Sequence, residues 1–423
     1  MRDDVFEAAY LVETPLDIGK VAEVMAGEQS CGTFTRVANE TDELRARARA
    51  RVMAIEPLGE SSTPSLHSEW LRRKGIGGPY RRARVRIEFP VANVGTNLAT
   101  LPSVVAGNLY DLGETTGLRL DHLALPAAYR KTFPMPTQGV AGTRTLAGVA
   151  SGPLIGTIIK PNVGMTSEAT AELVGQLCEA GLDFIKDDEI SANSHHAPLA
   201  TRIPAVMDKV RRHRDKTGKM VMVSFNISDE TDAMRRHADL VAKEEGTSVM
   251  VSINWCGFSA VETLRRHTDL AIHGHRNGFG AFARHPMLGM SFQPYQALWR
   301  LSGVDHMHVY GLDSKFVQTN DEVVEAAADC LAPLATGLAD AVMPAFSSGQ
   351  WAGTVPQTYA AVGTTDLLFM AGGGVLAHPI GPKAGVTSIR QAWDATVAGV
   401  PLETAAKTSS ELASALSFFS GRV

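Results

Sequence analysis

A lysine followed by three consecutive acids closes an apolar run in the segment GLDFIKDDE, residues 181–189. On a strand alternate side chains share a face, so Lys186 and Asp188 should point one way and Asp187 the other. Glu189 falls where the strand ends. Such a group is costly to desolvate unless a cation gathers it, and its oxygen atoms are ligands that suit Mg²⁺. The segment therefore indicates either a magnesium site or a solvated strand end at which the lysine neutralises its neighbours.

Side chains that can move protons or hold anions follow other apolar runs in the second half of the chain. They are Lys160, Asn226, His273, His275, Arg276, His306, His308, Lys315, Ser347, Gly349 and the triplet Gly372-Gly373-Gly374. Lysine and histidine serve as general acids and bases, and glycines let backbone N–H groups approach an anion closely. One histidine alone is more often structural, but the repetition of such groups after successive runs is typical of an active site.

The elements that must position these residues are apolar runs separated by amphipathic stretches, from about residue 146 to residue 423. The predicted strands are Leu154–Lys160, Asp183–Lys186, Met220–Asn226, Ser248–Asn254, Leu270–His273, His306–Tyr310, Ala341–Phe346 and Asp366–Met370, with helices at Ser167–Glu179, Ala233–Lys243 and Asp321–Cys330. Apolar strands that alternate with helices predict a parallel sheet covered on both faces. Eight such units predict a TIM (β/α)8 barrel. An open doubly wound sheet is the alternative, which we discount because no G-x-G-x-x-G follows the first strand.

In such a barrel the active site lies at the carboxyl ends of the strands, which is where the polar residues fall. Phosphates often bind at the last two loops, and this favours the glycine triplet as a phosphate site. Arg276 and His308 lie on the other side of the predicted barrel mouth and are candidates for holding a second anionic or polar group.

Residues 1 to about 145 predict a smaller α+β domain. Its predicted strands are Phe6–Val12, Thr33–Val37 and Arg82–Phe89, with a short helix at Ile18–Ala26. The third strand alternates arginine with apolar residues and is therefore expected to be half buried. The whole chain has a net charge of −5, so these arginines favour a solvated sheet face over a surface for phosphate or nucleic acid.

The composition excludes several classes of protein. The chain has 423 residues, of which 44% are hydrophobic and 20% charged, as in an ordinary globular protein of about two domains. The cysteines lack C-x-x-C spacing, so neither a zinc site nor a disulfide framework is predicted. No apolar run reaches membrane-spanning length, and the first residues lack the apolar core of a signal peptide. We therefore expect a cytoplasmic protein with a small-molecule ligand and no nucleic-acid or membrane partner.

The motifs of nearly the whole chain, from residue 1 to about residue 405, resemble in order those of the RuBisCO large chain. They are GTIIKP at 156–161, GLDFIKDDE at 181–189, HGHR at 273–276, RLSGVDHMH at 300–308 and AGGGVLAHP at 371–379. Near the N-terminus, EQSCGTF at 28–34 resembles the family's ESSTGTW, with Phe34 in place of the tryptophan. Thr96-Asn97 and Gly107-Asn108 follow in the family's order. The succession of strands and helices in residues 1–145 resembles the ferredoxin-like N-terminal domain of that family.

The resemblance implies a carbamylated lysine as a metal ligand. Lys186 would react with CO₂, and its carbamate would hold Mg²⁺ together with Asp188 and Glu189. The implied catalytic residues are Lys160, Lys186, His275 and Lys315. The implied contacts to the substrate and its phosphates are Glu28, Thr33, Asn97, Arg276, His308, Ser347, Gly349, Gly372 and Gly373. Glu28 and Asn97 stand in segments that cross the dimer interface in the family, so the resemblance also implies a homodimer or higher even oligomer with shared sites.

Three departures separate the chain from the carboxylases of the family. Asn162 stands where they have a second lysine, Ser314 where a glycine precedes the loop lysine, and Phe279 where they have a histidine. The pattern is that of a RuBisCO-like protein (form IV of the superfamily) and not of a ribulose bisphosphate carboxylase. The retained groups suit removal of a proton next to a metal-bound carbonyl, with Lys160 or the carbamate of Lys186 as the base.

The resemblance favours one branch of RuBisCO-like enzymes. The enolase that acts on 2,3-diketo-5-methylthiopentyl 1-phosphate has a lysine directly after the glycine that aligns with Gly107, and here that residue is Asn108. We therefore expect decarboxylation, or transcarboxylation and hydrolysis, of 3-oxo-isoapionate 4-phosphate. The alternatives are the enolase or another sugar-phosphate isomerase and, from a different class, a non-catalytic binding or regulatory protein.

Overall fold

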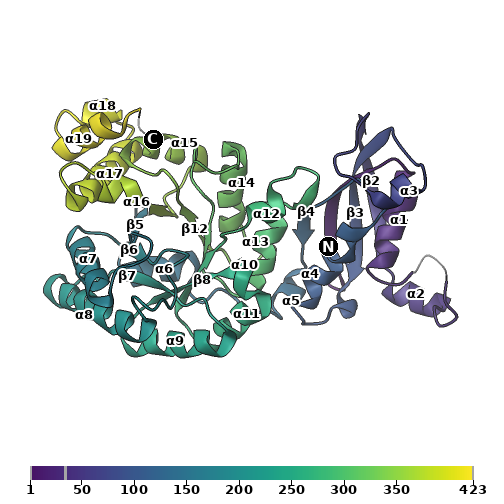
Figure 1. Cartoon of the computed structure of the whole chain (residues 1–423), viewed down its shortest axis with the longest axis horizontal. Coiled ribbons are helices and arrows are strands. Elements are labelled where there is room, and N and C mark those ends of the chain that lie inside the picture. The colour runs from purple at the N-terminus through teal and green to yellow at the C-terminus, as the bar shows by residue number, and fades with distance from the viewer. Residues whose placement is uncertain (1, 33–35, 422–423) are drawn as a thin grey trace. The chain divides into compact units, whose positions relative to one another are not determined.

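The computed structural model describes residues 2–32 and 36–421, and it divides into two compact units (Figure 1). The first unit comprises Met1–Pro134, Gly278–Ser302 and Pro333–Ala339, and the second comprises Met135–Asn277, Gly303–Ala332 and Asp340–Val423. The first three residues of the predicted strand Thr33–Val37 lie outside the described ranges. Among the helices that are described, none has both the length and the apolar character needed to cross a membrane.

A five-stranded mixed sheet forms the centre of the first unit, in the order β10-β4-β1-β3-β2. The strands are β1 Val5–Thr14, β2 Arg51–Ser61, β3 Tyr80–Pro90, β4 Gly117–Ala124 and β10 Leu288–Met290. Strand β1 pairs antiparallel with β3 and β4, β2 pairs antiparallel with β3, and β10 runs parallel to β4. Helices α1 (Ile18–Glu28) and α4 (Thr100–Val105) follow β1 and β3. This is the predicted ferredoxin-like arrangement, extended by β10.

Strand β3 has one buried face and one charged face. Its buried residues are Ala83, Val85, Ile87 and Phe89. On the other face Arg82 Nε lies 2.8 Å from Glu13 Oε2, and Arg86 Nη1 lies 3.3 Å from Glu7 Oε2. The prediction of a half-buried strand with its arginines on a solvated face is therefore confirmed.

Three strands of this sheet, β2, β4 and β10, were not predicted from the sequence. Strand β2 is mostly exposed, and its pairing with β3 is irregular between Pro57 and Gly59. It lies at an edge of the sheet, where a strand needs no alternation of apolar residues. Strand β10 has only three residues and is recognisable only by its pairing with β4.

The second unit is a closed parallel barrel, in the strand order β11-β12-β13-β5-β6-β7-β8-β9. Its strands are β5 Leu154–Ile158, β6 Phe184–Lys186, β7 Met222–Asn226, β8 Ser248–Ser252, β9 Ala271–His275, β11 His306–His308, β12 Met343–Phe346 and β13 Leu368–Met370. The predicted TIM barrel is therefore confirmed. Each strand differs from its prediction by one or two residues at one end or at both, and β9 is the strand that extends past its predicted end, to include His275.

Helices cover the outside of the barrel strands (Figure 1). In the second unit they are α6 Gly139–Ala147, α7 Ser167–Glu179, α8 Leu199–Thr217, α9 Thr231–Lys243, α10 Ile253–Cys256, α11 Phe258–His267, α14 Asn320–Leu331, α15 Val355–Val362, α16 Gly372–Leu376, α17 Pro382–Val397, α18 Leu402–Ala405 and α19 Ser410–Phe419. The first unit also contains α2 Asp42–Ala48, α3 Glu69–Arg73, α5 Ala127–Arg130, α12 Gly280–Ala283 and α13 Phe292–Leu301. Polar side chains mark where some helices begin. Thr166 caps α7, and Thr319 forms a capping box with Glu322 on α14.

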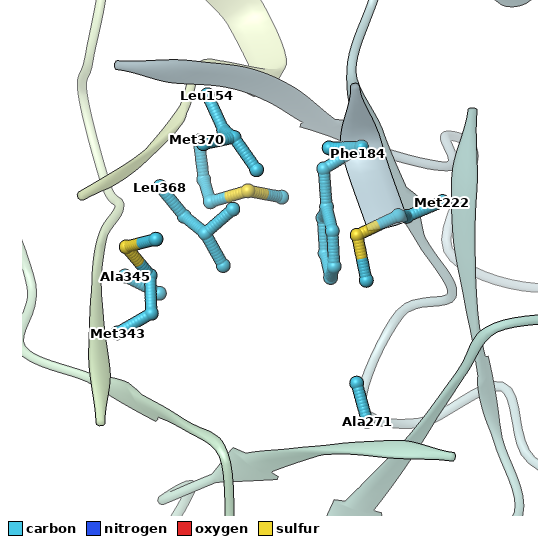
Figure 2. Close-up of a cluster of buried hydrophobic side chains, with 9 residues drawn as sticks. Leu154, Phe184, Met222, Ala271, Met343, Ala345, Leu368 and Met370 are labelled. Carbon is cyan, nitrogen blue, oxygen red and sulfur yellow. The ribbon is translucent and has the colours of Figure 1, made fainter. Parts of the chain in front are cut away.

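The barrel interior is apolar at one level and polar at the next. Figure 2 shows apolar side chains gathered inside the ring of strands, namely Leu154, Phe184, Met222, Ala271, Met343, Ala345, Leu368 and Met370. Two residues beyond Phe184 and Ala271 stand Lys186 and His273, on the same side of their strands because side chains alternate. The apolar level therefore lies next to the polar residues and supports them by close packing.

Candidate active site

Lys186 is a buried amine at the end of β6, with 1% of its surface exposed. Its Nζ donates a hydrogen bond to the backbone oxygen of Asp187 at 3.0 Å and lies 3.6 Å from Met250 Sδ. Glu189 Oε2 is 3.9 Å away. Burial lowers the pKa of Lys186 to about 8, although the three neighbouring acids act to raise it. A lysine with this pKa is neutral in an appreciable fraction of molecules near pH 7 and is then a nucleophile.

Lys160 and Asp188 join the ends of β5 and β6. Lys160 Nζ lies 2.6 Å from Asp188 Oδ2. Asp188 is buried, whereas the side chain of Lys160 is 41% exposed and therefore open to a ligand. The backbone N–H of Ile190 donates to the other oxygen of Asp188 at 3.3 Å. The pair places a partly exposed ammonium group directly beside a predicted metal ligand.

Glu189 faces His275, which ends β9. His275 Nε2 lies 3.5 Å from Glu189 Oε2. The backbone N–H of Asn277 donates to His275 Nδ1 at 3.3 Å, so a neutral ring carries its hydrogen on Nε2, towards Glu189. Burial is the main cause that lowers the pKa of His275 well below its usual value, which keeps this ring neutral.

A second layer of side chains holds the acids in place. Asp187 points away from Lys186 and pairs with the buried Arg202, with Nη2 to Oδ2 at 2.9 Å. Asn226, at the end of β7, donates through Nδ2 to the backbone oxygens of Asp188 and Glu189, both at 3.1 Å. Its own backbone N–H donates to Asp187 Oδ2 at 2.9 Å. The alternation predicted for these acids is confirmed, but the sequence carried no signal for the contact with Arg202.

A modified Lys186 would complete a set of three oxygen ligands for Mg²⁺. Within residues 2–32 and 36–421, no three histidine, cysteine, aspartate or glutamate side chains are grouped as a ready set of metal ligands. Asp188 and Glu189 supply two carboxylates, and the third member is an amine, which is a poor ligand for a hard cation. A carbamate on Lys186 would supply the missing anionic oxygen. The donor set therefore fits a magnesium ion held by carbamylated Lys186, Asp188 and Glu189.

The loops after β12 and β13 carry the residues predicted to bind phosphate. Ser347 follows β12 and is buried, and Gly349 has a φ of 78°, in the left-handed region that favours glycine. Helix α16 begins at Gly372. A Cβ atom on Gly374 would lie 2.5 Å from the backbone oxygen of Gln350, so only glycine lets these two loops approach each other.

Arg276 and His308 occupy the tips of β9 and β11. Arg276 is fully buried, its guanidinium carbon lies 4.0 Å from the centroid of the Tyr310 ring, and its Nη2 donates to Gln318 at 2.5 Å. His308 lies next to His275, with 4.3 Å between ring centroids, and contacts Ser347.

The loop that carries Lys315 is tied at its base. Asp313 Oδ1 accepts from Asn320 Nδ2 at 2.9 Å, and Oδ2 accepts from Gln357 Nε2 at 2.8 Å. Lys315 is exposed, with Nζ 5.4 Å from the ring centroid of Phe316. Within the described residues, three of the four non-glycine positions with positive φ fall in this loop and the next, at Tyr310, Asp313 and Ser348. Backbone strain of this kind concentrates at functional sites.

The remaining predicted residues belong to the first unit. Glu28 ends α1 and accepts from Asn108 Nδ2 at 3.2 Å. Asn97 accepts from the backbone N–H of Ala99 at 3.0 Å, and both Glu28 and Asn97 are exposed. Thr33 lies outside the described residues.

Phe279, which stands where the carboxylases have a histidine, also lies in the first unit. It is buried, with its ring centroid 4.5 Å from that of Tyr295. The substitution is thus accommodated by aromatic packing.

Two regions of the chain match the family descriptions of the RuBisCO large chain. Residues 3–129 match "Ribulose bisphosphate carboxylase large chain, N-terminal domain", and residues 139–419 match "Ribulose bisphosphate carboxylase large chain, catalytic domain". The chain therefore belongs to the RuBisCO large-chain family. Within this family it is a RuBisCO-like protein, as predicted, because the relatives and the solved structure described next belong to this group.

The chain is 48% identical over 412 residues to a 3-oxo-isoapionate-4-phosphate transcarboxylase/hydrolase of Xanthobacter autotrophicus, covering 97% of this chain and 98% of that protein. It is 42% identical over 413 residues to a 3-oxo-isoapionate-4-phosphate decarboxylase of Rhizobium rhizogenes, covering 97% of each. These names agree with the prediction of an enzyme of the RuBisCO superfamily.

Solved structures give the same family. A rubisco-like protein from Burkholderia fungorum has a TM-score of 0.94 and 60% identity, covering 98% of this chain and 100% of that chain. A Rubisco from Hyperthermus butylicus, described as dimeric, has a TM-score of 0.85 and 28% identity, covering 99% and 96%.

Proposed function

We propose that this protein is a Mg²⁺-dependent enzyme that cleaves 3-oxo-isoapionate 4-phosphate, by decarboxylation or by transcarboxylation and hydrolysis. The observation that carries the proposal is the cluster of Lys160, Lys186, Asp188 and Glu189, which keeps proton-moving and metal-holding groups in contact. The names of relatives at 48% and 42% identity support the substrate. The absence of the second lysine at Asn162 supports a reaction that captures no free CO₂.

The chain's own residues divide the work of such a reaction. Carbamylated Lys186, Asp188 and Glu189 hold the magnesium ion, which when bound supplies a Lewis acid that polarises a carbonyl oxygen. Loss of a carboxyl group from a β-keto acid leaves its electron pair on the neighbouring carbon as an enolate, which must then gain a proton. Lys160 Nζ, which is partly exposed and 2.6 Å from Asp188, is placed to donate that proton.

The charged ends of the substrate are assigned to the loops after the strands. Backbone groups of Gly372, Gly373 and Gly349 hold its phosphate, because glycines allow a close approach of N–H groups. His275 keeps its Nε2 hydrogen directed at Glu189 and so orients that ligand. Lys315, on its exposed loop, contributes a positive charge when the loop meets the substrate.

We also assign a homodimer with shared sites. Glu28 and Asn97 are exposed in the first unit, and in this dimer they would reach the barrel of the partner subunit. The assignment is supported by the dimeric description of the Hyperthermus butylicus Rubisco.

The test is a direct assay of the purified protein with Mg²⁺, CO₂ and 3-oxo-isoapionate 4-phosphate labelled in its carboxyl group. Release of labelled CO₂ identifies a decarboxylase. Retention of the label in a carboxylic acid that the enzyme forms by cleaving the substrate identifies a transcarboxylase/hydrolase. Ribulose bisphosphate with labelled bicarbonate is the matched control, and no label should be fixed. Fixation of label, or lack of any turnover of the keto acid, would contradict the proposal.

A further inference from the structure

Three histidines form a continuous hydrogen-bonded row inside the barrel. His308 Nε2 lies 2.9 Å from His273 Nε2, and His273 Nδ1 lies 3.4 Å from His306 Nδ1. His273 and His306 are fully buried and His308 is 3% exposed. Water therefore does not compete for these ring nitrogens, and each ring must satisfy its hydrogen bonds within the row.

A hydroxyl group closes each end of the row. At the carboxyl end of β12, Ser347 Oγ lies 3.2 Å from His308 Nδ1. At the other end, Thr143 Oγ1 on α6 lies 2.8 Å from His306 Nε2. Thr143 also donates a short hydrogen bond to the backbone oxygen of Gly139, one turn earlier in the helix.

The number of hydrogens leaves the row only two arrangements. Burial lowers the pKa of all three imidazoles, so each is neutral and carries one N–H. If one ring reverses its donor, its neighbour loses a partner, so all three must reverse together. In one arrangement the hydrogens point from Ser347 towards Thr143, and in the other they point from Thr143 towards Ser347.

Thr143 distinguishes the two arrangements because it has one hydrogen and two possible acceptors. When it donates to Gly139, its oxygen accepts from His306 Nε2, and both short contacts are hydrogen bonds. When Thr143 donates to His306, its oxygen still lies close to the backbone oxygen of Gly139, but no hydrogen lies between the two oxygens. The first arrangement makes one more hydrogen bond between groups of the protein, five against four, and is therefore favoured in the free protein.

We infer that Thr143 and His306 are positioning residues that set the direction of hydrogen bonding at Ser347 in the active site. In the favoured arrangement Ser347 gives its only hydrogen to His308, so its oxygen has only lone pairs for a ligand. Ser347 then accepts a hydrogen bond from a hydroxyl group of the substrate and cannot donate one through its side chain to a phosphate. A buried threonine on α6 thereby selects for a substrate group that can donate a hydrogen bond at this point, such as a hydroxyl group, over one that only accepts.

This inference rests on the proposed function only for the identity of the substrate, since the direction of the row is a property of the protein itself. The first test is neutron diffraction from crystals of the wild-type protein. It should show hydrogen on Nε2 of His308, on Nδ1 of His273 and on Nε2 of His306. Hydrogen on Nδ1 of His308 would overturn the inference, whether or not any variant folds.

The second test uses Thr143→Val, which removes the hydroxyl group and keeps the shape of the side chain. Without an acceptor for His306 Nε2 the row should reverse, so that His308 donates to Ser347 from Nδ1. Thr143→Ser keeps the hydroxyl group and should keep the wild-type arrangement. Thr145→Val is the matched control on the same helix, because Thr145 is exposed and its hydroxyl group donates to the backbone oxygen of Ala141 at 3.0 Å.

Kinetics then report the consequence for binding. In Thr143→Val the oxygen of Ser347 offers the substrate one lone pair in place of two, so the KM for 3-oxo-isoapionate 4-phosphate should rise by up to about tenfold with kcat little changed, a change no larger than the worth of one hydrogen bond. Thr143→Ser and Thr145→Val should stay near the wild-type value. A reversed row with an unchanged KM would refute the role of Ser347 as an acceptor. If the keto acid is not turned over at all, the proposed function fails, and the neutron result alone decides the direction of the row.

Discussion

Carbamylation of Lys186 should have a pH dependence set by the burial of this lysine. CO₂ reacts with the neutral amine, so the initial rate follows the fraction of Lys186 that has lost its proton. Burial lowers the pKa of Lys186 to about 8 from 10.5. We expect the rate at constant dissolved CO₂ to rise about tenfold per pH unit below pH 8 and to level off above it.

The magnitude of the effect follows from the same pKa. At pH 7 a lysine with a pKa of about 8 is neutral in about one molecule in ten, and one with a pKa of 10.5 in about one in 3,000. The buried position therefore raises the reactive fraction about 300-fold.

The lowered pKa also has a consequence for stability. The folded pKa lies below the unfolded one, so the charged lysine destabilises the fold below pH 8, and this cost disappears as the pH rises to 10.5. The cost at pH 7 is about 3 kcal/mol. Lys186→Met should thus abolish turnover but leave the metal-free protein at least as stable as the wild type at pH 7.

The assay follows the carbamate carbon by ¹³C NMR after the metal-free protein is mixed with ¹³CO₂ between pH 6.5 and 9.5. Lys186→Met should show no carbamate signal. Lys209→Met is the control, because Lys209 is a half-exposed lysine on the outside of the barrel, paired with Glu172 at 2.7 Å. A rate that still rises tenfold per unit above pH 9 would refute the lowered pKa. A signal that persists in Lys186→Met would place the carbamate on another amine.

Three further predictions concern the support of the site and its assembly. Asn226→Ala removes the two hydrogen bonds to the backbone of Asp188 and Glu189. It should lower turnover about 10- to 100-fold and weaken Mg²⁺ binding in a metal titration. Unchanged turnover and Mg²⁺ affinity would show that the two acids keep their positions without Asn226. Arg202→Met leaves Asp187 buried without its charged partner, and it should lower the free energy of unfolding, measured with urea, by about 3–5 kcal/mol. Lys209→Met should lower it by less than about 1 kcal/mol. Equal effects of the two substitutions would contradict the importance of burial. Mixed dimers of Glu28→Ala and Lys186→Ala chains should recover about half of the wild-type activity, because one of the two shared sites is then intact. If verified mixed dimers recover no activity, each site lies within one chain.

Local pattern was enough to predict the barrel and the centre of its site. Barrel strands are buried on both faces, so they stand in the sequence as short apolar runs, and all eight were found within a few residues of their observed bounds. Strand alternation also separated Asp187 from Lys186 and Asp188, because the direction of a side chain depends only on its position in the strand. Motif order predicted the family and the keto-acid substrate named in its relatives.

Contacts between segments that are distant in the sequence could not be predicted from such patterns. Strands β2 and β10 lie at the edges of the first sheet, where pairing and not apolar periodicity defines a strand. The role of Asn226 as a donor to two backbone oxygens was missed because the residue was recognised only as the end of a strand.

The histidine row shows most clearly what only the tertiary structure decided. From the sequence, His273, His306 and His308 were candidates to be judged one at a time, and Thr143 stood in the segment expected to belong to the N-terminal domain. Closure of the barrel brings β9, β11, β12 and α6 together and excludes water from between them. Each ring then depends on its neighbour for a hydrogen bond, so the state of one residue is fixed by residues far away along the chain. The sequence alone determined which chemical groups are present and on which side of each strand they lie, and the closed barrel decided which of them share hydrogens.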